Sequence, residues 1–169
     1  MDFVAFYRGT EPDHQGRTLP DILRWSDARL EAGHDYIHVL FPLQEPSKHI
    51  PNAPVLDAAC LAEFRKDPII QTNLLLSFRR MLDFYGFQLA DPGKLEIVPA
   101  PDFPRKADNW LFVGDHNHLR ITRILRCLTA CGLQDQAAAF LKTLLSVAEP
   151  QRVSEETLGY WKRAVSPEA

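Results

Sequence analysis

The chain has 169 residues, of which 46% are hydrophobic and 24% are charged, and its formal net charge is −3 at pH 7. This length suits one domain, and the composition is ordinary for a globular protein. The slightly acidic balance excludes a globally basic nucleic-acid-binding domain. We therefore expect a single domain over 1–169 and no nucleic-acid partner.

The sequence shows no targeting or membrane signal. No basic start followed by an apolar stretch opens the chain, and no apolar run approaches the roughly 20 residues that span a bilayer. The three cysteines, Cys60, Cys127 and Cys131, form neither a CxxC pair nor a zinc-ligand series. They are expected to be small core side chains. We expect a soluble, cytoplasmic protein without a transmembrane segment or a cofactor.

Proline and glycine mark the expected helix boundaries in the N-terminal half. Thr18 is a predicted N-cap with a proline in the first turn, and one or two short helices follow as far as Gly33. A further helical segment at 35–40 ends before Pro42, because proline disfavours helical geometry in the residue before it. The stretch 43–55 holds three more prolines and predicts an extended, ordered loop.

Two longer helices are expected next. Asp57 is the predicted cap of a helix that reaches about Lys66, and Asp67 with its following proline opens the longest helix, which ends at Gly86. Apolar residues of this longest helix recur at the spacing of one core-facing stripe. They are Leu74, Phe78, Met81, Leu82 and Tyr85.

The C-terminal half is expected to combine a long loop with three helices. Residues 90–104 contain four prolines, which predicts a loop with room for one short strand. Helices follow at about 116–131, at about 134–148 and from Ser154 onward, and Gly132 supplies a left-handed stop after the first of them. With no run of alternating strands, the predicted fold is all-α, a compact irregular bundle of six to seven helices with long Pro-rich loops.

Two histidines four residues apart raise the possibility of a metal site. On a helix His34 and His38 would share one face, as in HExxH zinc sites, with Asp35 in the place of the glutamate. Gly33, the short reach of aspartate and the lack of a third ligand argue against it. The alternative is that His34 hydrogen-bonds the turn while His38 faces solvent. A metal-dependent hydrolase that uses His34 and His38, or His116, is the alternative function.

A basic stripe is expected on the helix at about 116–131. His116, Arg120 and Arg123 are spaced i, i+4 and i+7, and a helix start offers free N–H groups and partial positive charge. The stripe predicts an anion site for a carboxylate, a phosphate or an acidic side chain. The alternative, which we favour, is that Arg120 and Arg123 pair with internal carboxylates. The candidate partners are Asp35, Asp83 and Glu45.

Other candidate site residues are an amide and two indoles. Asn117 falls near the centre of the apolar arc, so its amide must be satisfied by capping the helix or by tying down a loop. Tryptophans at helix edges are usually core residues, but one that lines a groove is a natural peptide anchor. The candidate ligand-binding residues are His116, Arg120, Arg123, Asn117, Trp25 and Trp110. No activated nucleophile or nucleotide motif is present, and no enzyme activity is expected.

Four stretches of the sequence resemble the conserved N-terminal domain of the opioid growth factor receptor family. They occur in the family's order and span about residues 7–148. They are Asp21-Ile-Leu-Arg-Trp25, His34-Asp-Tyr-Ile37 with Leu40-Phe-Pro-Leu43 and Glu45-Pro46, Leu82-Asp-Phe-Tyr-Gly86, and Asn117 through Leu125.

The resemblance implies a receptor-like, non-catalytic helical domain. Animal members are described as receptors for an opioid pentapeptide and as negative regulators of cell growth at the nuclear envelope. This sequence contains neither their long repeat-bearing C-terminal region nor their basic targeting segments, so opioid signalling and a nuclear location are not expected of it. We expect a binding module for a peptide or protein partner or a small anionic ligand.

Overall fold

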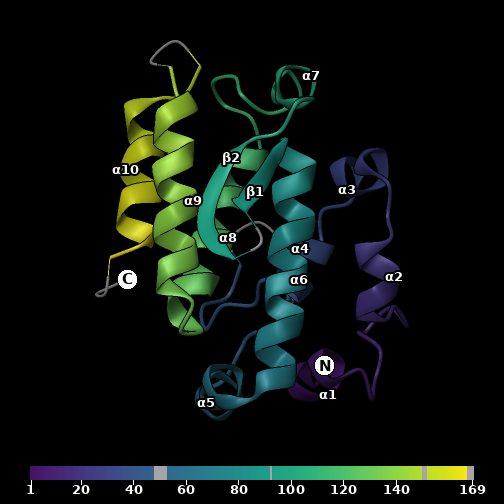
Figure 1. Cartoon of the computed structure of the whole chain (residues 1–169). Coiled ribbons are helices and arrows are strands. Elements are labelled where there is room, and N and C mark those ends of the chain that lie inside the picture. Colours follow the sequence, from purple (N-terminus) through teal and green to yellow (C-terminus); the bar gives the residue numbers. More distant parts are fainter. Residues whose placement is uncertain (48–52, 92, 150–151, 167–169) are drawn as a thin grey trace. The chain divides into compact units, whose positions relative to one another are not determined.

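The structure is a computed structural model that describes residues 1–47, 53–91, 93–149 and 152–166 (Figure 1). Backbone contacts group the chain into two units, Met1–Arg80 and Met81–Ala169, and each is described by itself. The prediction of a single domain stays a prediction. Ten helices and one two-stranded sheet lie within the described ranges. The all-α prediction is therefore right about the helical majority, but it is wrong in leaving out a sheet and in counting six to seven helices.

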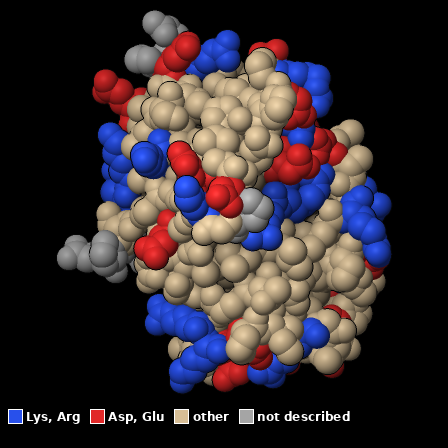
Figure 2. Space-filling view, viewed as in Figure 1, with Lys and Arg blue, Asp and Glu red and all other residues tan. Residues whose placement is uncertain are grey.

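The surface carries charges of both signs. On the face that Figure 2 shows, Lys and Arg side chains lie among Asp and Glu side chains. Among the described segments, no helix is both long and apolar enough to cross a membrane.

The first unit is built from six helices in its described residues. They are α1 (Phe3–Arg8), α2 (Leu19–Leu23), α3 (Asp27–Ala32), α4 (Tyr36–Leu40), α5 (Ala58–Lys66) and α6 (Pro68–Tyr85), which continues past the unit boundary. The Thr18 hydroxyl accepts from the backbone N–H of Asp21, whose carboxylate accepts from the backbone N–H of Thr18. This capping box satisfies two N–H groups that the helix start leaves open. Asp57 caps α5 through the backbone N–H of Cys60, so the helices expected between residues 18 and 86 are confirmed.

Helix α1 was not predicted, because its six residues are too short to show a periodic pattern. Aromatic packing holds it in place, since Phe3 and Tyr7 meet the Phe64 ring edge-on at centroid distances of 6.4 and 4.8 Å. The Tyr7 hydroxyl donates to the Leu40 carbonyl, and the Asn73 amide donates to the Tyr7 carbonyl at 2.6 Å. These contacts tie α1 to α4, α5 and α6. Of the predicted loop at 43–55, residues 48–52 lie outside the described residues.

The second unit packs three long helices around a hairpin. Its elements are β1 (Phe87–Asp91), β2 (Lys94–Pro99), α7 (Phe103–Ala107), α8 (Asn117–Ala130), α9 (Gln134–Val147) and α10 (Glu155–Ala164). The strands pair antiparallel, α9 lies along β2, and α10 lies beside α8 and α9 (Figure 1). The Thr143 hydroxyl donates to the Ile97 carbonyl at 2.7 Å and so ties α9 to β2. The three helices predicted after residue 115 are confirmed.

The hairpin occupies most of the loop predicted at 90–104. Only Phe87 and Ile97 are buried on the two strands, so the sequence lacks the alternation that would reveal them. Gly86 starts the hairpin with a φ of 86°, and a Cβ there would lie 3.0 Å from the Cα of Phe103. Glycine is therefore required by both its backbone conformation and the close approach of α7.

Two of the three cysteines predicted as core side chains are buried, one on α8 and one at its C-cap. Cys127 and Cys131 are fully buried with their sulfur atoms 3.9 Å apart, whereas Cys60 on α5 is half-buried. Burial raises the pKa of the Cys127 thiol well above its ordinary value, which keeps it protonated and unreactive.

Candidate functional site

The predicted basic stripe of α8 runs from solvent into the interior of the second unit. His116 precedes the helix with 43% of its side chain exposed, Arg123 is half-buried, and Arg120 is only 5% exposed. Nη1 of Arg120 donates to Oδ1 of Asn117 at 3.1 Å. Of the three basic side chains, only that of His116 is exposed.

The N-cap residue of α8 is His116 rather than Asn117, and the aspartate before it binds the first open N–H group of the helix. Oδ1 of Asp115 accepts from the backbone N–H of Asn117 at 2.8 Å, and the second oxygen lies 3.5 Å from Nδ1 of His116. The Asn117 side chain is fully buried and accepts from Arg120. Its amide oxygen is therefore bound within the first turn of the helix.

Two carboxylates predicted as partners of Arg120 and Arg123 bind cations within their own units. Oδ2 of Asp35 accepts from Nη2 of Arg17 at 2.6 Å. Oδ1 of Asp83 accepts from Nζ of Lys106 at 2.9 Å. The first pair ties the loop before α2 to the start of α4, and the second ties α7 to α6.

Trp110 lies in the core of the second unit. It is 1% exposed, and its Nε1 donates to the Tyr85 carbonyl at 3.1 Å. The Trp110 carbonyl lies 3.0 Å from Nε2 of His118, and Nε1 of Trp161 donates to the His118 carbonyl at 3.2 Å. Burial lowers the pKa of His118, although Asp115 and the Trp110 carbonyl oppose that shift. The indole N–H groups of Trp110 and Trp161 are thus both bound by backbone carbonyls of the same unit.

Of the predicted histidine pair, only His38 lies on α4, and His34 precedes the helix. His34 is exposed, but His38 is only 7% exposed, so the prediction that it faces solvent is wrong. The reason is that α4 is buried along its whole length. Within the described parts of the chain, no three His, Cys, Asp or Glu side chains lie close enough together to hold a metal ion.

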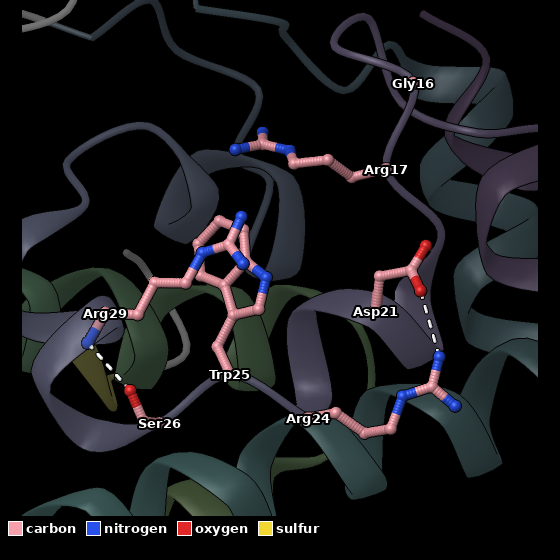
Figure 3. A pocket seen from close by; sticks show the side chains of 7 residues that line it. All are labelled: Gly16, Arg17, Asp21, Arg24, Trp25, Ser26 and Arg29. Atoms are coloured by element: carbon pink, nitrogen blue, oxygen red, sulfur yellow. Dashed lines mark hydrogen bonds and ion pairs between the residues drawn. The ribbon is translucent and has the colours of Figure 1, made fainter.

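Trp25 lines an open pocket of about 530 Å³ in the first unit, a volume within the usual range of ligand sites. The pocket lies beside α2 and α3, as Figure 3 shows. Its lining residues are Gly16, Arg17, Asp21, Arg24, Trp25, Ser26 and Arg29. Three guanidinium groups and one carboxylate make it polar and positively charged, unlike the mostly apolar pockets that bind neutral small molecules.

Arg80 of α6 holds in place the connection between α2 and α3, which carries Trp25. Nη2 of Arg80 donates to the Trp25 carbonyl at 2.8 Å and to Oδ1 of Asp27 at 2.7 Å. The Trp25 ring meets the buried Tyr36 ring edge-on at 5.8 Å. These contacts fix the backbone and one edge of the indole while its remaining surface stays half-exposed.

Arg17 forms a rigid wall of the pocket. Its Nε donates to Asp13 at 2.7 Å and its Nη2 to Asp35 at 2.6 Å. The Asp13 carboxylate is fully buried and also accepts from the backbone N–H groups of Gln15 and Arg17. Although burial acts against both charges, this pairing holds the pKa of Arg17 above and that of Asp35 below the ordinary value.

The other two arginines are less restrained. Arg24 is exposed and donates to Oδ1 of Asp21 at 2.9 Å. Arg29 stacks on the indole, with its Cζ 4.0 Å from the centroid of the Trp25 ring. No carboxylate of the described residues forms an ion pair with Arg29. Its guanidinium thus offers hydrogen-bond donors at the mouth of the pocket (Figure 3).

Of the six predicted ligand-binding residues, only Trp25 lines this pocket, and the three arginines were missed. Arg17, Arg24 and Arg29 alternate with aspartates in the sequence, which is the pattern of an ordinary solvated surface. The four-residue spacing of Trp25 and Arg29 gives no signal either, because Trp25 lies between α2 and α3 and the helical rule for such pairs does not apply there. The other five predicted residues belong to the second unit.

Comparison with known proteins gives one consistent result. Residues 4–169 match the family described as the opioid growth factor receptor conserved region. The opioid growth factor receptor of Homo sapiens is 36% identical over 96% of this chain and 25% of its own length. The receptor of Rattus norvegicus is 34% identical over 96% of the chain and 29% of its own.

A related protein gives the same picture. Opioid growth factor receptor-like protein 1 of Xenopus tropicalis is 32% identical over 84% of this chain and 28% of its own length. The chain thus spans less than a third of the length of these relatives. No solved structure matches it.

Proposed function

Because the chain belongs to the opioid growth factor receptor family, we propose that it is a non-catalytic, receptor-like binding module for a peptide or protein partner. The pocket around Trp25 takes up an anionic group of that partner. One observation carries the proposal: the Arg29 guanidinium is stacked on a half-exposed indole and has no ion-pair partner in the described part of the chain.

The chemistry of this pair favours recognition of an anion. A planar guanidinium can donate two parallel hydrogen bonds to a carboxylate or a phosphate. Stacking on Trp25 occupies one face of the Arg29 group and leaves its N–H edges free to bind. The part of the indole that solvent reaches adds apolar contact area next to the charge. Tryptophan and arginine are the residues that most often dominate binding energy at interfaces.

A titration with acidic peptides tests the proposal. The reporter is the indole N–H resonance of Trp25, since those of Trp110 and Trp161 are held in internal hydrogen bonds. We expect saturable shifts, and at least a tenfold loss of affinity in Arg29→Ala. Arg79→Ala is the matched control, because Arg79 is also exposed in the first unit but lies outside the pocket. Equal losses in both variants would show a general charge effect and contradict the proposal.

The binding role predicted for residues of the second unit stays a prediction, and the same titration measures it. His116→Ala and Arg120→Ala are the informative variants, because one removes an exposed group and the other a buried one. An unchanged affinity in Arg120→Ala would remove it, together with its partner Asn117, from the binding site. A loss in His116→Ala without one in Arg120→Ala would keep His116 in the contact and exclude Arg120.

A further inference from the structure

We propose that the pocket around Trp25 recognises a phosphate monoester carried by a peptide, that is, a phosphorylated side chain of a partner. This inference rests on the proposed function and names the chemistry of the anionic group. Two arginines that line the pocket, Arg24 and Arg29, carry the inference. Arg24 forms an exposed ion pair with Asp21, whereas Arg29 stacks on the Trp25 indole.

Arg29 supplies the fixed half of the site. Its Cζ lies 4.0 Å from the Trp25 ring centroid, so the plane of the guanidinium is held by the indole. The Trp25 backbone is in turn fixed by the hydrogen bond from Arg80 at 2.8 Å. A donor group that is ordered before the ligand arrives loses less entropy on binding.

Arg24 supplies the movable half. The Asp21 carboxylate is held in position without Arg24. Its Oδ2 accepts from the backbone N–H of Thr18 at 3.0 Å and from the Thr18 hydroxyl at 2.6 Å. These hydrogen bonds from Thr18, followed by that from Arg24, hold the pKa of Asp21 below its ordinary value. Asp21 therefore stays ionised and in place when Arg24 turns toward a ligand.

The number of donors favours a phosphate over a carboxylate. A carboxylate has two oxygens, which one guanidinium satisfies in a bidentate pair. A phosphate monoester carries about −1.5 to −2 charges and three terminal oxygens at pH 7, enough to accept from both Arg24 and Arg29. The Ser26 hydroxyl, which lines the same pocket, is a third donor within the site.

The surroundings favour a single phosphate over a polyanion. Carboxylates of Asp21 and Asp27 flank the pocket, with side chains 48% and 40% exposed. A nucleic acid or an anionic membrane would bring several phosphates against these like charges. One phosphate on an otherwise uncharged peptide segment brings far less negative charge against Asp21 and Asp27, and Arg24 and Arg29 can compensate it.

The test is a titration of the isotopically labelled full chain with blocked pentapeptides, acetyl-Ala-Gly-X-Gly-Ala-amide, followed at the Trp25 indole resonance. X is phosphotyrosine, phosphoserine, tyrosine or glutamate, and inorganic phosphate and a short single-stranded oligonucleotide are further ligands. We expect the phosphopeptides to bind at least tenfold more tightly than the glutamate peptide and inorganic phosphate. Arg29→Ala should abolish that preference, Arg24→Ala should reduce it severalfold, and Arg79→Ala should leave it unchanged.

Each contrary outcome has a distinct meaning. If the glutamate peptide binds as tightly as the phosphopeptides and also depends on Arg29, the phosphate inference is wrong and the proposed function stands. If inorganic phosphate binds as tightly, or the oligonucleotide binds more tightly with the same dependence on Arg29, a phosphopeptide is not the ligand. If none of the ligands shifts the Trp25 indole resonance of a chain that thermal unfolding shows to be folded, both proposals fail. Arg29→Lys separates charge from shape, because it should retain less than a tenth of the affinity.

Discussion

The surroundings of Trp25 and Trp161 show how the same residue type can serve two purposes. Trp161 is fully buried, its Nε1 donates to the His118 carbonyl at 3.2 Å, and its ring meets the His118 ring edge-on at 5.5 Å. Trp25 is half-buried and meets a charged guanidinium at 4.0 Å. Where the indole N–H is bound internally, the tryptophan stabilises the fold. Where the indole carries a guanidinium without a carboxylate partner among the described residues, the pair can bind a ligand.

The largest expected loss of stability comes from removing Trp161, the buried tryptophan of this comparison. Trp161→Ala should lower the free energy of unfolding by about 3–5 kcal/mol, because it leaves a large cavity in the core. Trp25→Ala should cost clearly less, since part of its ring already faces solvent. Urea denaturation of both variants measures the difference. Equal losses would mean that Trp25 is a core residue and that the pocket is incidental.

The second effect concerns the wall of the pocket. Arg17→Ala removes charge-assisted hydrogen bonds to the buried Asp13 carboxylate, and bonds of that kind contribute about 1.5–3 kcal/mol. We expect a loss of stability in that range by urea denaturation. Arg24→Ala is the matched control, because its ion pair is exposed and should contribute little. If both variants are equally stable, Arg17 does not hold the pocket together.

Much of the fold could be predicted because its signals are local. The Thr18 capping box, the Asp57 cap and the stripe of α6 are each written within a few neighbouring residues. The hairpin could not be predicted, since its strands bury only Phe87 and Ile97 and depend on tertiary contacts with α9.

The site was harder to predict than the fold. Trp25 was chosen as a candidate, but its arginines were not, because residue type does not reveal which charges are neutralised by neighbours. Arg17 forms ion pairs with two carboxylates, whereas Arg29 forms none with a carboxylate of the described residues. The sequence does not distinguish the two arginines. Burial determines in the same way whether Arg120 can reach a ligand. Its spacing places it on a basic stripe, but in the fold it is only 5% exposed.

A third prediction tests the buried cluster through pH. Burial depresses the pKa of His118 in the folded state, whereas an unfolded histidine has a pKa of about 6.5. The contribution of His118 to stability is therefore complete above about pH 6.5 and is lost as the pH falls through the folded pKa, because the unfolded chain then binds the extra proton. His118→Gln should flatten this slope, which cannot exceed about 1.4 kcal/mol per pH unit for one proton. The measurement is urea denaturation between pH 7.5 and pH 5, and an unchanged slope in the variant would contradict the assignment.

The smallest expected effect sharpens the other half of the comparison. The stack of Arg29 on Trp25 is exposed, and a cation over an exposed aromatic ring contributes about 0.5–1 kcal/mol. Arg29→Ala should therefore lower the free energy of unfolding by no more than that, although it should remove most of the binding at the pocket. Arg29→Lys keeps the charge and should be still closer to the unsubstituted chain in stability. The two quantities separate the roles of this residue: a small loss of stability with a large loss of affinity is expected of a binding group, because its donors are satisfied only in the complex. A loss of 2 kcal/mol or more, on the scale of about 1.5–3 kcal/mol for hydrogen bonds to charged groups, would instead assign Arg29 to the same structural class as Arg17.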